Sequence, residues 1–275
     1  ASALEDATKL NVIVCDKTGT LTVGQPEVVE IVTANGITED QLLTAAAAVE
    51  QGSDHPLAQA ILRKAENLTV KAPTKFESLD GMGARAETAA GTVFLGNRLL
   101  MDTQKLALDG LESEATRMQE GGRTAVHVAQ AGRVIGLIAI ADAIRPSSKA
   151  MVEKLGKRGI EVVMLTGDNE ATARRIAKDL GIDSVMADVL PAQKAEKVKE
   201  LQAQGKKVGM VGDGVNDAPA LTQAEVGFAI GAGTDVAMES ADVVLMKSDP
   251  YDIVGAIELS RATVRKMHQN LWWAV

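Results

Sequence analysis

The sequence predicts an α/β protein with a doubly wound, mainly parallel sheet and an inserted α+β domain. Three short apolar runs, each followed by a polar turn, have the composition of buried parallel strands: residues 12–14, 162–165 and 208–211. Three amphipathic segments have helical periodicity: residues 147–157, 170–180 and 192–204. This alternation of strands and helices indicates a doubly wound sheet.

A long internal stretch interrupts this rhythm. It contains helical segments at 39–51, 56–66 and 111–120, and short strands punctuated by glycines or lying within 124–138. This pattern indicates an α+β domain with a largely antiparallel sheet. We therefore expect four segments, which are the first part of the parallel domain, the insert, the second part of the parallel domain and the start of a transmembrane helix: residues 1–27, 28–138, 139–266 and 267–275.

The composition excludes several classes of protein. The chain has 275 residues, of which 46% are hydrophobic and 24% charged, as in ordinary globular proteins. Its net charge of -8 argues against nucleic acid as a partner, because binding the phosphate backbone requires a basic surface. Cys15 is the single cysteine, so the chain forms no intrachain disulfide, and its apolar neighbours indicate a packing role.

The last residues allow two interpretations. Basic residues at 261, 265 and 266 precede the apolar stretch at 271–275, which contains two tryptophans. One interpretation is the cytoplasmic edge of a membrane helix, where aromatic and basic residues gather. The other is a terminal helix that packs its aromatic side chains on the core.

Polar residues follow each of the three predicted parallel strands. Parallel sheets bind ligands at the carboxyl ends of their strands, so Asp16, Thr166, Asp168 and Asp213 are expected along one rim. A carboxylate such as Asp16, followed by a turn with exposed amides and hydroxyls, can act as a nucleophile toward phosphorus.

Further charged residues favour phosphoryl transfer at this rim. Asp213 and Asp217 bring more carboxylates toward Asp16, and clustered carboxylates with phosphate favour bound Mg²⁺. Thr166 and Gly167 supply a hydroxyl and an amide, and Lys194 can neutralise the charge of a transferring phosphate.

These motifs resemble those of the P-type ATPases, within the haloacid-dehalogenase-like phosphotransferases. The resemblance rests on residues 16–20 (DKTGT), 166–169 (TGDN), Lys194 and 213–217 (DGVND). It implies ATP and Mg²⁺ as cofactors, with phosphorylation of Asp16 and metal binding by Asp16, the Thr18 carbonyl and Asp213. It also implies that Thr166 and Lys194 contact the phosphate, that Gly167 and Asp168 contribute to cofactor binding, and that Asn216 and Asp217 support the site.

Position 18 distinguishes pumps from related phosphatases. The phosphatases usually carry a second aspartate two residues after the nucleophile, which acts as general acid and base, whereas this chain has Thr18. Without that carboxylate, water should attack the aspartyl phosphate slowly, as a pump requires for its conformational change.

The insert carries a second set of motifs. Residues 53–57 (SDHPL) resemble the Ser-Glu-His-Pro-Leu motif of heavy-metal-transporting P-type ATPases, with Asp54 in place of Glu. The resemblance implies that Glu50 and His55 meet adenine, and that Gly81, Gly83 and Gly96 allow close approach of the nucleotide. Asn97, which follows Gly96, belongs to the same motif and is also expected to contribute to nucleotide binding. His55 on its own could simply cap a helix. Because only 2% of the residues are aromatic, we expect His55 and aliphatic side chains to hold the base.

The resemblance covers nearly the whole chain and implies the cytoplasmic catalytic domains of an integral pump of the bacterial plasma membrane. Its partners would be the missing actuator and transmembrane domains, whose helices bind the transported ion. The ending at 267–274 (MHQNLWWA) is more similar to copper or silver exporters, so Cu⁺ or Ag⁺ is the expected cargo. A Zn²⁺, Cd²⁺ or Co²⁺ pump, a soluble phosphatase of the same superfamily and an ATP-sensing module remain as alternatives.

Overall fold

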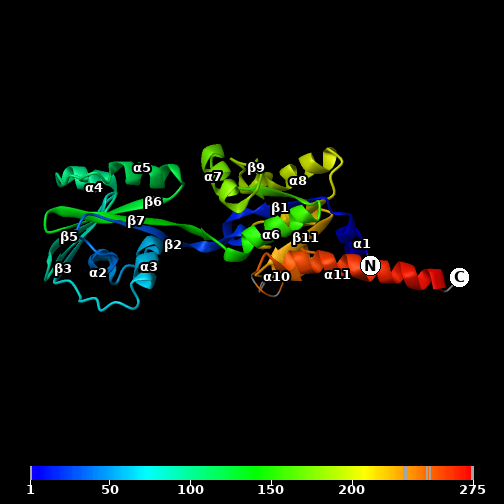
Figure 1. Ribbon diagram of the computed structural model, residues 1–275, viewed down its shortest axis with the longest axis horizontal. Coiled ribbons are helices and arrows are strands. Elements are labelled where there is room, and N and C mark those ends of the chain that lie inside the picture. Colours follow the sequence, from blue (N-terminus) through cyan, green and yellow to red (C-terminus); the bar gives the residue numbers. More distant parts are fainter. Residues whose placement is uncertain (1, 232–234, 246, 248, 274–275) are drawn as a thin grey trace. The chain divides into compact units, whose positions relative to one another are not determined.

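The computed structural model describes residues 2–231, 235–245, 247 and 249–273, and the chain divides into two compact units (Figure 1). The first unit comprises Ala1–Gly24 and Ile144–Val275, and the second comprises Gln25–Ala143. Two long strands, β2 (Thr22–Thr33) and β7 (Arg133–Ile144), contain the points where the units divide. The expected boundaries after residues 27 and 138 fall inside these same strands.

The first unit is built on a six-stranded sheet in the order β12-β11-β10-β1-β8-β9, and every pair of neighbours is parallel. The strands are β1 (Val12–Asp16), β8 (Glu161–Leu165), β9 (Ser184–Met186), β10 (Val208–Gly212), β11 (Val226–Ile230) and β12 (Val243–Leu245). All five residues of β1, of β10 and of β11 are buried, because helices cover both faces of the sheet.

Successive residues of β1 contribute to different cores. Ile13 and Cys15 pack with residues of α1, α6, α7 and α11, whereas Val12 and Val14 pack with residues of α8 and α9. The helices of this unit are α1 (Ser2–Lys9), α6 (Pro146–Lys157), α7 (Glu170–Leu180), α8 (Lys194–Ala203), α9 (Ala218–Gln223), α10 (Asp235–Ser240) and α11 (Asp252–Trp273). The predicted doubly wound parallel sheet is confirmed.

The second unit contains a six-stranded sheet in the order β2-β7-β6-β5-β4-β3. Four successive pairs of neighbours are antiparallel, namely β3–β4, β4–β5, β5–β6 and β6–β7, as the sequence predicts for the insert. Its other strands are β3 (Lys75–Leu79), β4 (Gly83–Thr88), β5 (Gly91–Gly96) and β6 (Thr124–Gln130). Helices α2 (Glu39–Glu50) and α3 (Pro56–Lys64) pack in one core, and α4 (Arg98–Thr103) and α5 (Glu112–Glu120) in another.

Side-chain caps fix where the helices of the second unit begin. Thr38 accepts a hydrogen bond from the Gln41 amide, and the Gln41 side chain accepts one from the Thr38 amide, which completes a capping box before α2. His55 caps α3 by accepting a hydrogen bond from the Leu57 amide at 3.2 Å, and Pro56 occupies the first helical position.

His127 is more deeply buried than its sequence context suggests. An apolar strand pattern indicates a half-buried residue, but His127 in β6 is 0% exposed. The ring lies near the backbone of Gly96 and Ala125, yet neither nitrogen has a hydrogen-bond partner among the described residues, and burial lowers the pKa of the imidazole. A neutral ring therefore belongs to the core of this unit.

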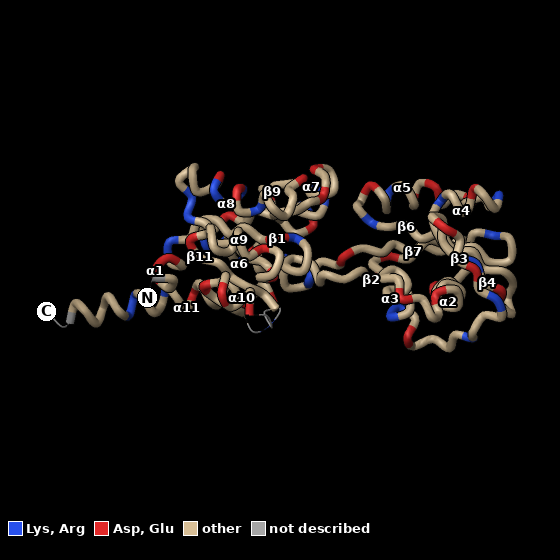
Figure 2. The backbone as a smooth tube through the Cα atoms, turned by 180° about the vertical axis from the view of Figure 1, so that it is seen from behind, with Lys and Arg blue, Asp and Glu red and all other residues tan. Residues whose placement is uncertain are grey.

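Helix α11 continues through residues 267–273, where the sequence allows either the start of a membrane helix or a terminal helix packed on the core, and residues 274–275 lie outside the described part. Trp272 is 86% exposed, so this side chain does not pack on the core. Within the described residues, no helix combines the length and apolar character needed to cross a membrane. Basic and acidic residues are interspersed over both units (Figure 2).

Candidate active site

Three neighbouring strands of the first unit place the predicted catalytic residues at one edge of the parallel sheet. Asp16 is the last residue of β1, Thr166 directly follows β8, and Asp213 directly follows β10. Because β10, β1 and β8 are adjacent and parallel, their carboxyl ends lie together.

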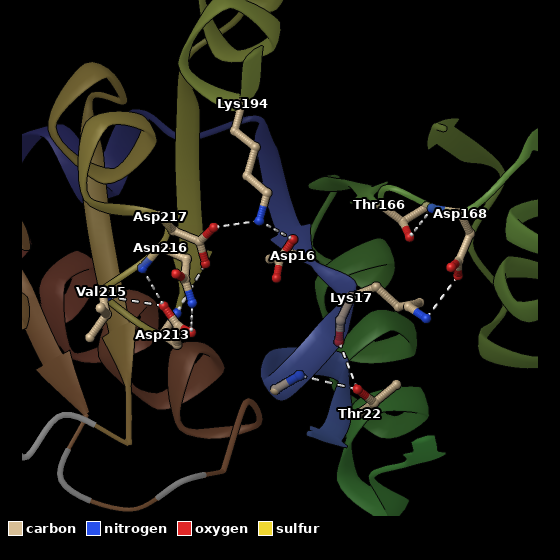
Figure 3. A network of polar contacts seen from close by, with 11 residues as sticks. Asp16, Lys17, Thr22, Thr166, Asp168, Lys194, Asp213, Val215, Asn216 and Asp217 are labelled. Carbon is tan, nitrogen blue, oxygen red and sulfur yellow. Dashed lines mark hydrogen bonds and ion pairs between the residues drawn. The ribbon is translucent and has the colours of Figure 1, made fainter. Parts of the chain in front are cut away.

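Lys194 joins two carboxylates at the centre of this edge (Figure 3). Its Nζ lies 2.8 Å from Asp16 Oδ1 and 2.6 Å from Asp217 Oδ1. The side chains of Asp16, Lys194 and Asp217 are only 9%, 11% and 1% exposed. Lys194 is the first residue of α8, and Pro191–Gln193 form a short turn before it.

The charges in this cluster shift one another's pKa values. Burial and the neighbouring Asp217 carboxylate raise the pKa of Asp16 to about 6, against the opposing effect of Lys194. Burial disfavours the Lys194 ammonium, but hydrogen bonds to Asp16 and Asp217 outweigh it and raise the pKa of Lys194. Lys194 therefore remains charged and stabilises the ionised form of Asp16.

The loop after β10 is organised around Asp213. Asp213 Oδ1 accepts hydrogen bonds from the amides of Val215 and Asn216 at 3.0 and 3.1 Å. Asp213 Oδ2 accepts another from Asn216 Nδ2 at 3.1 Å, and the Asp213 amide donates to Asp217 Oδ2. Asn216 thus orients Asp213, while Asp217 belongs to the Lys194 cluster.

The loop after β8 faces the residue next to the candidate nucleophile. The Thr166 hydroxyl accepts a hydrogen bond from the Asp168 amide at 3.1 Å. Asp168 Oδ2 forms an ion pair with Lys17 Nζ at 2.8 Å. Lys17 therefore connects the turn after Asp16 to the loop that carries Thr166.

A tight turn follows Asp16. Gly19 has φ of 77°, which favours glycine, and its amide donates to the Thr22 hydroxyl at 3.2 Å. The Thr22 hydroxyl in turn donates to the Lys17 carbonyl at 3.0 Å. These bonds place Thr18 in an extended conformation inside the turn, with φ of -73° and ψ of 123°.

The oxygen atoms at this edge suit Mg²⁺. Among the described residues, no three His, Cys, Asp or Glu side chains form a group that could hold a metal. Mg²⁺ is usually bound by one or two carboxylates, with phosphate and water completing its octahedron. Asp16, Asp213 and the Thr18 carbonyl would supply oxygen ligands of this kind to Mg²⁺ that arrives with a phosphate.

The second unit has a pocket of about 480 Å³ that gathers the other predicted residues. Glu50, His55, Gly81, Gly83, Gly96 and Asn97 all line it. None of the residues that line the pocket is Lys or Arg, and burial raises the pKa of Glu50 in spite of nearby His55. The pocket thus suits a neutral heterocycle better than a triphosphate.

Two glycines that line this pocket, one in β4 and one in β5, allow the backbone to pack closely there. A methyl group on Gly96 would overlap the Met82 carbonyl oxygen, and one on Gly83 would overlap the Leu95 carbonyl oxygen. Asn97 follows Gly96 and caps α4 by accepting a hydrogen bond from the Leu100 amide at 3.1 Å, while its Nδ2 donates to the Gly81 carbonyl.

We expect Gly96→Ala to weaken binding of adenine nucleotides at least about tenfold, because the overlap with Met82 forces the pocket apart. Calorimetric titration with a non-hydrolysable ATP analogue measures this change. Gly156→Ala is the matched control, since a methyl group there would contact no described residue beyond its chain neighbours and the backbone of its own helix. Equal affinity of the Gly96 variant and the wild type would contradict the role of this close approach.

Sequence reasoning missed two features of these sites. Phe76, which is 51% exposed, lines the pocket of the second unit, so an aromatic ring is present where only His55 and aliphatic residues were expected. Arg145 bonds the turn after Asp16 from 123 to 126 residues away. A lone arginine just before Pro146, where the chain returns from the insert, was the signal available for it.

Comparison with known proteins identifies a family and several relatives with a similar sequence. The family model of haloacid dehalogenase-like hydrolases matches residues 10–225. A probable copper-exporting P-type ATPase V of Mycobacterium tuberculosis is 47% identical over 98% of this chain, and a probable copper-exporting P-type ATPase of Archaeoglobus fulgidus is 45% identical over 100% of it. The chain spans 36% and 34% of the lengths of these relatives.

Solved structures of ATPases also resemble this chain. A zinc-transporting PIB-type ATPase in its E2.Pi state has a TM-score of 0.86 and 40% identity, covering 98% of this chain and 44% of that one. The catalytic domain of the CPx-ATPase CopB-B has a TM-score of 0.60 and 29% identity, and the match covers 94% of this chain and 93% of that one. The chain therefore belongs to the haloacid dehalogenase-like hydrolases, and it matches the catalytic region of metal-transporting P-type ATPases.

Proposed function

We propose that this chain binds ATP through the pocket of its second unit and transfers the γ-phosphate to Asp16 in its first unit. The observation that carries the proposal is the buried Asp16–Lys194–Asp217 cluster at the carboxyl ends of parallel strands. On this view the first unit is the phosphorylation domain and the second is the nucleotide-binding domain.

The proposed step is an in-line displacement at phosphorus. An oxygen of the Asp16 carboxylate forms the new bond to the γ-phosphorus, and the bond to the oxygen that bridges the β- and γ-phosphates breaks, which releases ADP. Lys194 and the Thr166 hydroxyl would meet charge on the transferred group. Mg²⁺, held by Asp16, Asp213 and the Thr18 carbonyl, would neutralise phosphate charge.

The lack of a carboxylate at position 18, two residues after Asp16, favours a lasting phosphoenzyme. Thr18 has no acid-base function at neutral pH, and the Asp217 carboxylate is engaged by Lys194. Attack by water on the phosphorylated Asp16 would therefore be slow. This distinguishes the proposal from a soluble phosphatase, which should hydrolyse simple phosphate esters with repeated turnover.

We further propose that the chain works in a membrane pump that exports Cu⁺ or Ag⁺, together with actuator and transmembrane domains. Support comes from relatives named as copper exporters, including one of Bacillus subtilis that is 42% identical over 99% of this chain. The zinc-transporting structure with 40% identity keeps a Zn²⁺, Cd²⁺ or Co²⁺ pump as the second candidate.

The experiment that tests the cargo is ATPase activity of the full-length protein in lipid vesicles, titrated separately with Cu⁺, Ag⁺, Zn²⁺, Cd²⁺ and Co²⁺. We expect stimulation by the two monovalent ions and none by the divalent ions. Stimulation by Zn²⁺ or Cd²⁺ instead would retain the pump and replace its cargo. Hydrolysis of p-nitrophenyl phosphate without any response to metal would favour the phosphatase.

A further inference from the structure

Arg145 lies at the junction between the inserted unit and the catalytic sheet. It follows β7, the strand that returns from the second unit, and directly precedes α6. Asp16 and its turn lie before β2, the strand that leads into the same unit. One arginine thus stands where both connecting strands meet the first unit.

The side chain of Arg145 binds the backbone of the turn after Asp16. Its Nε donates to the carbonyl oxygens of Thr20 and Thr22 at 3.1 and 3.0 Å, and Nη2 donates to the Gly19 carbonyl at 3.1 Å. The Arg145 amide also donates to the Leu21 carbonyl at 2.9 Å. Arg145 therefore meets the carbonyls of all four residues from 19 to 22.

Ser148, one turn further along α6, reinforces this arrangement. Its hydroxyl is fully buried and donates to the same Leu21 carbonyl at 2.8 Å. Buried carbonyl groups without partners are costly, so the turn depends on these donors to keep its shape. The planar guanidinium offers several donors in fixed directions, which a lysine ammonium cannot reproduce.

We propose that Arg145 is a positioning residue for phosphoryl transfer, which fixes the turn of residues 17–22 so that Asp16 and the Thr18 carbonyl face the incoming phosphate. This role rests on the proposed function, because only phosphorylation of Asp16 makes the position of the turn important for catalysis. Arg145 itself does not touch the phosphate. Small displacements of reacting groups lower rates strongly, so the position of this turn matters for the rate.

The predicted effect of substitution is selective. Arg145→Ala should slow phosphoenzyme formation about 100-fold, and Arg145→Lys about tenfold, because charge remains but the fork of donors is lost. Affinity for a non-hydrolysable ATP analogue should stay within about twofold, since every residue that lines the pocket belongs to the second unit. Methylguanidinium should partly restore the rate of Arg145→Ala.

Rapid-quench labelling with γ-labelled ATP measures the rate, and hydrogen–deuterium exchange of residues 17–22 reports the turn independently of activity. The matched control is Arg158→Ala, which removes an arginine at the other end of α6 that pairs with Glu258. Exchange should rise in Arg145→Ala and remain at the wild-type level in Arg158→Ala.

Wild-type rates and wild-type exchange in Arg145→Ala would overturn the positioning role. A rate that falls only in proportion to the folded fraction, with no rescue by methylguanidinium, would do so as well. Absence of labelling in the wild-type chain, with the expected exchange difference still present, would instead contradict the proposed function.

Discussion

Asp16→Asn is expected to abolish phosphate incorporation from ATP, with a loss of more than about 1,000-fold. The carboxamide lacks the negative oxygen that attacks phosphorus, and no other carboxylate in the Lys194 cluster stands at the end of β1. Acid-quenched labelling with γ-labelled ATP, followed by hydroxylamine, which cleaves acyl phosphates, measures the change.

The same substitution should leave the fold intact. Asp217 remains to neutralise Lys194, and removal of one of two carboxylates that face each other relieves their repulsion. Asp183→Asn, at an exposed position of the same unit, is the matched control and should label like the wild type. Persistent, hydroxylamine-sensitive label in Asp16→Asn would place the acceptor elsewhere.

The parallel sheet and its rim were predictable because buried parallel strands carry a strong local signal. The runs before Asp16, Thr166 and Asp213 are apolar and end abruptly at polar turns, so strand ends and candidate site residues appear together in the sequence. General rules for such sheets then place those residues at one edge.

Other features depend on contacts that the sequence does not encode locally. Strand β2 contains Gly24, Pro26 and several half-exposed positions without alternation, so no period of two identifies it. The bonds from Arg145 to the turn after Asp16 connect residues more than 120 positions apart. Phe76 lies on the edge strand β3, where four of five residues are exposed, which hides its place at the pocket.

Lys194→Met is expected to lower the free energy of unfolding of the first unit by about 3–5 kcal/mol, because it leaves Asp16 and Asp217 buried together without a cation. Phosphorylation should fall with it, since no positive charge remains to meet the phosphate. Scanning calorimetry, which separates the transitions of the two units, measures the stability. Lys197→Met, one turn along α8, removes a lysine that pairs with the exposed Glu200 and should change the stability by less than about 1 kcal/mol.

A double variant separates electrostatic repulsion from lost packing. If Asp16 and Asp217 repel each other once Lys194 is gone, Asp16→Asn in the Lys194→Met background should recover part of the lost stability, with a coupling of about 1–3 kcal/mol. If the losses of stability in the two single variants simply add in the double variant, Lys194 contributes through packing and not by neutralising Asp16. Because Asp16→Asn removes the nucleophile, stability rather than phosphorylation reports this coupling, so it measures how the lysine holds two buried carboxylates together independently of any chemistry at Asp16.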